Sequence, residues 1–163
     1  MSDHKIKYIV GGTLVYIDQG NEYIVNPLGA GWNQLTSPGG GLVWQEHLIG
    51  WLSLNNNLTG ELITNRGASP LGQIWNFSAS FSIRGDFIGG TTYELGIFHN
   101  GNFLPESGQI FLVTNENFVY HITLFGCANL VSRLDVFDIR ARITNGLGSW
   151  VYIERATFKG WLD

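Results

Sequence analysis

The sequence predicts an all-β protein, an antiparallel β-sandwich, from three observations. Apolar and polar side chains alternate along many short stretches, which is typical of strands with one buried face. Glycine-containing turn signals separate these stretches, for example Gly89-Gly90 and Asn100-Gly101. Helix signals are nearly absent: residues 43–52, VWQEHLIGWL, are the one candidate, and Gly50 interrupts them. We therefore expect no helix longer than about two turns.

The alternation is clearest in residues 75–84, WNFSASFSIR. Every second residue there is apolar and the residues between are Asn, Ser and Arg, which indicates a half-buried strand. Residues 133–143, RLDVFDIRARI, repeat the pattern, with Phe137 and Ile139 pointing inward and Asp138 outward. Further strands are expected at 5–10, 13–18, 21–26, 49–54, 60–65, 92–98, 109–114, 118–125 and 149–159.

The length of 163 residues suits one main domain, but strand length divides the chain unevenly. Residues 1–41 hold three short expected strands and then a stretch rich in Gly and Pro, which predicts an extended N-terminal arm or a small sheet. Residues 42–163 hold the long alternating strands and are expected to form the sandwich. We expect the arm to lie on a partner's surface, so that deleting residues 1–40 leaves a folded oligomer that no longer binds this partner.

The composition restricts the classes of partner. Charged residues make up 13% of the chain, and 9 basic against 13 acidic residues give a net charge of −4. Nucleic-acid binding needs clustered Lys and Arg, and no basic stripe is present, so we expect no nucleic-acid partner. The first ten residues lack the apolar core of a secretion signal, and no stretch approaches 18 apolar residues. We therefore expect no membrane span and no membrane partner.

Residues that carry chemistry are sparse. The four histidines (4, 47, 99 and 121) show no metal-ligand spacing such as H-x-H, so we expect no metal and no cofactor. The carboxylates form no evident acid–base pair, and phosphate-loop and nucleophile motifs are absent. Cys127 is the sole cysteine, which excludes an intrachain disulfide and indicates a buried or idle thiol. We expect no enzymatic activity; a cupin-like metal enzyme is the catalytic alternative.

Some strands are apolar on both faces, so their second face must be covered. Residues 118–125, FVYHITLF, and residues 150–153, WVYI, are the main cases. Either a loop or the N-terminal arm covers this face, or the face is a contact between subunits, which the scarcity of charge favours. Trp32 and Trp161 are candidates for ligand or partner contact, although we favour their anchoring of the arm and the C-terminus onto the sandwich.

The order of the strands after residue 73 resembles the tumour-necrosis-factor-like jelly roll. WNFSASFSIRG is followed by TTYELGIFHNGN, and then by VYHITLFG, LDVFDIRARITN and WVYIERATFKGWL. The order is also similar to that of small jelly-roll proteins on tailed-phage virions, namely capsid decoration (cement) proteins and fibre heads. The resemblance covers about residues 73–161 and includes a strand that ends in an Asn-Gly turn, Y-x-L-x-I-x-x-N-G.

The resemblance implies a homotrimeric structural protein of a virion. It implies a capsid decoration protein at the capsid surface, made in the host cytoplasm, whose partners are its own copies and the major capsid protein or other virion subunits. The alternative is a receptor- or carbohydrate-binding head domain of a tail fibre. Six aromatic residues are then candidates for the subunit interface: Tyr93, Phe98, Tyr120, Phe125, Trp150 and Tyr152.

Overall fold

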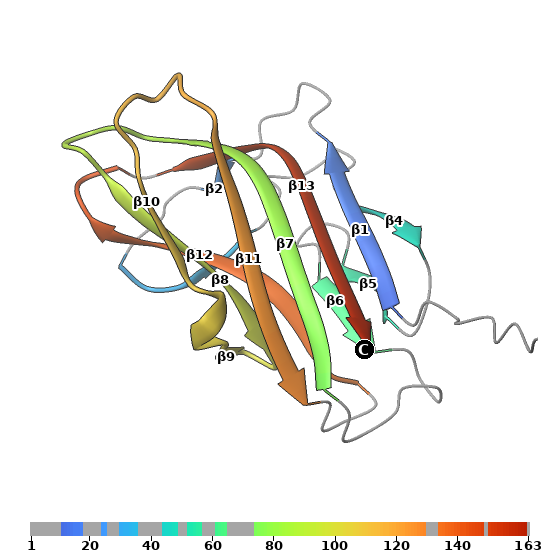
Figure 1. The fold of residues 1–163 in the computed structure, drawn as a ribbon. Helices are drawn as coiled ribbons and strands as arrows, with labels where there is room; N and C mark the ends of the chain where they lie inside the picture. Colours follow the sequence, from blue (N-terminus) through green and yellow to red (C-terminus); the bar gives the residue numbers. More distant parts are fainter. Residues whose placement is uncertain are drawn as a thin grey trace, which may run out of the picture.

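The computed structural model describes residues 11–17, 24–25, 30–35, 44–48, 52–56, 61–64, 74–129, 134–148 and 150–162. These residues form two antiparallel β-sheets that face each other across one core (Figure 1). The only helical element in the described part of the chain is a single 3₁₀ turn, η1 (Pro105–Ser107). The predicted all-β sandwich is therefore confirmed.

The first sheet, sheet A, has the strand order β11-β7-β13-β1-β4, and β2 pairs with β13. The long strand β7 lies between β11 and β13, so that Ser80 is opposite Thr123 on one side and Thr157 on the other. The strands of sheet A are β1 (Gly11–Ile17), β2 (Ile24–Val25), β4 (Trp44–Leu48), β7 (Ile74–Gly85), β11 (Tyr120–Asn129) and β13 (Val151–Leu162).

The second sheet, sheet B, has the strand order β10-β8-β12-β6-β5, while β3 pairs with β12 and β9 with β8. The register of its central pair runs from Phe137 opposite His99 to Asn145 opposite Thr92. The strands of sheet B are β3 (Asn33–Gln34), β5 (Leu52–Asn56), β6 (Glu61–Thr64), β8 (Thr92–His99), β9 (Asn102–Phe103), β10 (Gln109–Leu112) and β12 (Val136–Asn145).

The core lies between the sheets and is built from the inward-facing residues of alternating strands. Trp75, Phe77 and Phe81 of β7 are buried, as the alternation predicts. The rings of Phe77 and Phe137 stack across the two sheets, with centroids 4.0 Å apart. Burying one such side chain fully stabilises the fold by about 1.5–3 kcal/mol, so a core of this size holds the sheets together without metal or disulfide.

The Asn100-Gly101 turn joins β8 to β9 as a tight hairpin. Both residues have positive φ, 50° and 79°, as a primed turn requires. The Asn100 side chain also fixes the turn to the start of β12. Its Nδ2 donates to Asp135 Oδ1 over 2.7 Å, and Val136 N donates to its Oδ1 over 2.9 Å. His99 Nε2 lies 3.3 Å from the same buried Asp135 carboxylate, so these polar residues stabilise the turn.

The N-terminal part of the chain contributes strands to the sandwich itself. β1 lies inside sheet A between β13 and β4, and pairs with β13 from Gly11 opposite Trp161 to Ile17 opposite Arg155. β2 pairs with β13, and β3 pairs with β12. Deleting residues 1–40 would strip strands from both sheets, so we do not expect the truncated chain to fold. The boundary at residue 41 stays a prediction, and the strand expected at 5–10 lies outside the described residues.

The structure contains three short strands that the alternation does not predict. β3 and β9 have two residues each, and β4 has five. The two-residue strands β3 and β9 are too short to display a period, so their pairing depends on the neighbouring strand rather than on local pattern. β4 lies within residues 43–52, the one helix candidate, which is strand where it is described.

Candidate interaction surfaces

One side of the sandwich carries a group of exposed apolar side chains. β10 is the last strand of sheet B and β11 the last strand of sheet A among the described residues. Four apolar residues on or next to these strands are exposed, Ile110 to 64%; we call them the edge patch: Ile110, Leu112, Phe118 and Val119. Glu116 is the only charged residue between positions 109 and 119. Edge strands usually carry charges that prevent association, so this side is open to a partner.

A second exposed apolar group lies at the end of the sandwich where β7 turns into β8 and β12 turns into β13, at the left of Figure 1. It consists of Phe87, Ile88 and Leu147, which we call the tip patch; Leu147 is 77% exposed. The two loops contain one charged residue, Asp86, and it is buried. The tip patch is therefore an uncharged apolar surface.

Hydrogen bonds fix the two loops of the tip patch to each other. The Thr91 hydroxyl donates to Ile88 O over 2.9 Å and accepts from Gly148 N over 2.7 Å. Leu147 N donates to the same Ile88 O over 3.3 Å. The exposed side chains are thus presented by an ordered backbone, which lowers the entropic cost of binding a partner.

Two of the six candidate interface residues, Tyr93 and Phe98, are buried inside the chain, which corrects the prediction. The Tyr93 ring stacks on Phe111 with centroids 5.4 Å apart, and its hydroxyl donates to Asp86 O over 2.9 Å. Desolvation raises the pKa of Tyr93 well above its usual range, and the Asp86 carboxylate raises it further. Phe98 packs against the Trp32 ring in an edge-to-face arrangement, with the ring centroids 5.1 Å apart. The alternation misleads here because β8 is buried on both faces.

The other four candidates remain at least partly exposed, and their place in a subunit interface stays a prediction. Phe125, on the outer face of sheet A, is 61% exposed. Trp150 and Tyr152 are half-buried near the start of β13, where the Arg84 guanidinium lies 4.4 Å from the Tyr152 ring centroid. Tyr120, also half-buried, packs against the core at the start of β11.

Trp32 lies on the outer face of sheet B and is packed by the chain itself. Its ring centroid is 4.8 Å from that of Phe103, and the Arg142 guanidinium lies over the ring at 4.6 Å. Arg142 also forms an ion pair with Glu94 at 2.6 Å. The segment that contains β3 is held against sheet B by these contacts, which agrees with the anchoring interpretation of Trp32.

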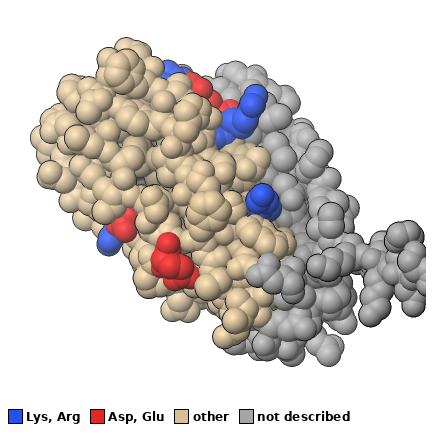
Figure 2. All heavy atoms as spheres, in the orientation of Figure 1, with Lys and Arg blue, Asp and Glu red and all other residues tan. Residues whose placement is uncertain are grey.

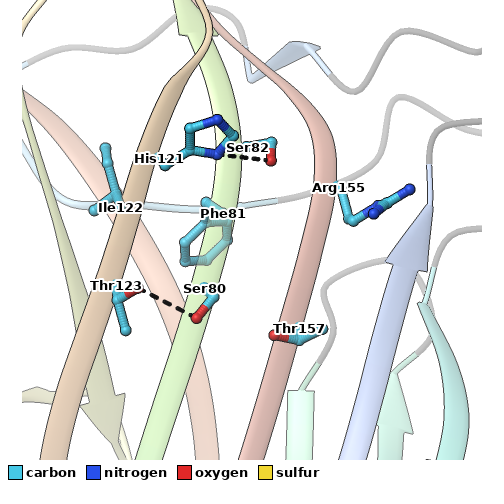
Figure 3. Close-up of a pocket in the computed structure, with 8 residues that line it drawn as sticks. All are labelled: Ser80, Phe81, Ser82, His121, Ile122, Thr123, Arg155 and Thr157. Carbon is cyan, nitrogen blue, oxygen red and sulfur yellow. Dashed lines mark hydrogen bonds between the residues drawn. The ribbon is translucent and has the colours of Figure 1, made fainter.

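The outer face of sheet A contains two shallow hollows. The first, of about 190 Å³, lies over β11, β7 and β13, and Arg155 projects at its β13 side (Figure 3). The Ser82 hydroxyl lies 3.2 Å from His121 Nδ1, and the hydroxyls of Ser80 and Thr123 are 3.3 Å apart. No carboxylate is among the described residues that line this hollow. The described residues there therefore lack the Ser–His–carboxylate arrangement of hydrolases.

The second hollow, of about 300 Å³, lies at the other end of the same three strands. The register places one residue from each strand in a row: Cys127 of β11 is opposite Asn76 of β7, which is opposite Trp161 of β13. Phe125 and Glu106 also line it. Trp161 is half-buried beside a hollow with an amide and a carboxylate nearby, as a ligand contact would require, and the Lys159 ammonium lies over its ring, 5.4 Å from the centroid.

The Glu106 carboxylate is held beside the second hollow by the outer edge of β11. Cys127 N donates to Glu106 Oε1 over 3.1 Å, a bond that also satisfies an edge N–H. Sequence reasoning missed Glu106, because nothing in the local stretch LPESG connects it to residue 127. Cys127 itself is exposed, since it lies on the outward-facing side of β11, so it is not a buried thiol.

Charged side chains are few on the face shown in Figure 2. Among the described residues, oppositely charged side chains occur in pairs: Arg140 Nε lies 2.7 Å from Asp138 Oδ2, and Arg84 Nε lies 3.0 Å from Glu154 Oε1. Over the described residues, no three metal-ligating side chains come together. A helix long and apolar enough to cross a membrane is likewise not found among them. Apolar contact surfaces thus stand out more than any chemical centre in this part of the chain.

Asp138 gives the fold a specific dependence on pH. Desolvation raises the pKa of Asp138 above its usual value of 3.8, against the lowering effect of Arg140. Between the pKa of Asp138 in the unfolded chain and its raised pKa in the folded chain, the folded state holds a proton that the unfolded state has lost. The free energy of unfolding therefore falls as the pH rises through this range. Relative to an Asp138→Asn variant, we expect the wild type to gain stability between pH 7 and pH 4, measured by urea unfolding of both proteins. A relative loss on acidification would mean that the Arg140 ion pair dominates.

No family model matches the chain, and no curated protein matches it. Among solved structures, murine APRIL at pH 5.0 is similar with a TM-score of 0.50 and 8% identity, over 94% of this chain and 99% of that one. Eiger TNF from S. frugiperda has a TM-score of 0.49 and 11% identity, over 95% and 92%. The globular domain of zebrafish complement 1qA protein also has a TM-score of 0.49 and 11% identity, over 94% and 96%.

These similarities concern the fold, because the identities are far below the level at which function is shared. The two packed antiparallel sheets have the strand orders β11-β7-β13-β1 and β10-β8-β12-β6, and they agree with the predicted jelly-roll β-sandwich. The chain has an antiparallel jelly-roll β-sandwich fold, similar to the fold of murine APRIL.

Proposed function

We propose that the chain is a structural protein of a virion, most specifically a capsid decoration protein that forms homotrimers and stabilises the capsid shell. The observation that carries the proposal is the edge patch: four exposed apolar side chains on the sides of two edge strands, with little charge near them. A soluble single molecule rarely leaves such a surface uncovered. The resemblance to trimeric jelly rolls supports a threefold ring in which each subunit repeats the same contact.

The tip patch is the surface proposed to meet the shell. Its three apolar side chains project from ordered loops, and the loops expose no charge, so the matching shell surface is an uncharged apolar pocket. A protein that binds only the assembled shell raises the stability of that shell by RT ln(1 + [L]/Kd). No catalytic step is needed for this role.

The shell contact can be tested with capsid shells of the virus that encodes the chain. Added protein should sediment with the shells and raise their melting temperature in calorimetry. A Leu147→Asp variant should remain a folded trimer and lose about tenfold or more in shell affinity, because a carboxylate would be buried in an apolar contact. Shells that neither bind nor are stabilised by the wild type would overturn the decoration function.

The alternative function, a receptor- or carbohydrate-binding head domain of a tail fibre, is favoured by one observation. Trp161 lines the second hollow together with Asn76 and Glu106. An aromatic ring beside an amide and a carboxylate can bind a ligand in either location, on a capsid or on a tail fibre.

A further inference from the structure

We propose that the second hollow binds a neutral saccharide, with Trp161 and Phe125 as stacking rings and Asn76 and Glu106 as polar contacts. The proposal assigns a site and a ligand class to the alternative function above. It does not depend on the edge patch, because Phe125 lies in β11 six residues after Val119, which stands just before that strand, a distance of about 20 Å for extended chain.

The apolar part of the site is formed by aromatic rings in fixed positions. Phe125 is 61% exposed on the outer face of sheet A, where its ring contributes little to the core. Phe77 lines the hollow from below, and it is itself stacked on Phe137 at 4.0 Å. Saccharide rings carry C–H groups on one face, and such faces lie well against exposed aromatic rings.

The polar part of the site matches hydroxyl groups. The Asn76 amide both donates and accepts, and an ionised Glu106 carboxylate accepts only. Cys127 N holds one carboxylate oxygen, Oε1, at 3.1 Å, which orients the group at the margin of the hollow. A saccharide hydroxyl can donate to the carboxylate and exchange hydrogen bonds with the amide. The Lys159 ammonium lies over the Trp161 ring, 5.4 Å from its centroid, so the opposite charges of Lys159 and Glu106 offset each other at this site, which favours a neutral saccharide over a strongly charged one.

The size of the hollow fits a small ligand. Its volume of about 300 Å³ lies at the lower end of ligand pockets, which indicates one or two sugar units rather than a long chain. Trp161 and Cys127 lie on strands two places apart in sheet A, a backbone separation of about 10 Å. The aromatic and polar groups can therefore reach one ligand together.

The apolar edge patch of a second copy would be a poorer occupant of the same hollow. Covering Asn76 and Glu106 with apolar side chains would remove them from water without replacing their hydrogen bonds. A ligand with hydroxyl groups replaces these bonds. The mixture of rings and hydrogen-bonding groups thus favours a saccharide over a second copy of the chain.

The test uses the full-length protein. A glycan array with neutral and acidic members should show binding to neutral glycans, and saturation-transfer NMR with the best of them should confirm it in solution. We expect Trp161→Ala and Phe125→Ala each to lower affinity by about tenfold or more. Trp161→Phe should retain part of the binding, because it keeps an aromatic ring. Thr123→Ala, on the same strand and face as Phe125 but outside this hollow, should bind like the wild type.

Each result decides the proposal. No binding to any neutral glycan in both assays overturns it, as does binding that survives the Trp161→Ala and Phe125→Ala substitutions together in a folded protein. Binding confined to acidic glycans overturns the neutral class. Light scattering on the same samples separates this outcome from self-association. If the protein is a trimer that binds no glycan, only the saccharide proposal is contradicted. If it is a monomer that binds glycan, only the trimer proposal is contradicted.

Discussion

A chain that carries Ile110→Asp and Phe118→Asp should be monomeric at concentrations where the proposed trimer of the wild type forms. Both positions belong to the edge patch, and Ile110 is 64% exposed in the single chain, so the substitutions need not disturb the core. In the trimer each contact would have to remove two carboxylates from water without a partner for them, which costs several kcal/mol. A threefold ring repeats the contact three times, so the loss is multiplied around the ring. Light scattering should show the mass falling from three times 18.1 kDa to 18.1 kDa.

A matched control separates the edge patch from exposed apolar residues in general. Ile74 is 58% exposed at the start of β7 and belongs to neither named patch. Ile74→Asp adds the same charge at a similar exposure and should leave the trimer intact. A wild-type chain that is monomeric at about 10 μM, far above the Kd of a stable interface, would contradict the self-association proposal directly.

The fold could be predicted from the sequence because most long strands have one face exposed to solvent. β7 alternates so regularly that the sequence predicts Phe77 and Ser80 on opposite faces, and the structure confirms both. β8 shows where the method fails. Its residues are buried on both faces, so Tyr93 and Phe98 resemble spare apolar side chains although they are covered by Asp86 O, Trp32 and their neighbours.

The surfaces were harder to predict than the strands, because they join residues far apart in the sequence. Phe118 and Phe125 lie in a stretch that is apolar on both faces, so part of the exposed apolar surface was anticipated. The tip patch was not, because Phe87 and Ile88 stand just before a glycine turn and carry no period. Glu106 reaches the second hollow only through the edge of β11, and this pairing has no local signal.

Phe77→Ala should be among the most destabilising single substitutions in the chain, at about 3–5 kcal/mol. The Phe77 side chain is 1% exposed and stacks on Phe137 from the opposite sheet, so its removal leaves a cavity between the sheets that neighbours fill only in part. For a chain of this size the loss corresponds to a fall in melting temperature of about 10 °C or more. Urea unfolding with a constant m-value would give the free energy directly. Phe77→Leu, which keeps most of the volume, should cost much less.

Phe125→Ala provides the comparison that gives this result its meaning. Phe125 is also a phenylalanine on sheet A, in the strand next to Phe77, but its side chain points away from the core and is 61% exposed. Its loss should change the free energy of unfolding by no more than about 0.5 kcal/mol, while it lowers saccharide affinity. If both substitutions destabilised the fold equally, Phe125 would have a structural partner and could not be a free stacking ring. A large difference in stability between two identical substitutions on adjacent strands would instead show that the fold does not depend on the outward-facing ring, which leaves Phe125 free to contact a ligand.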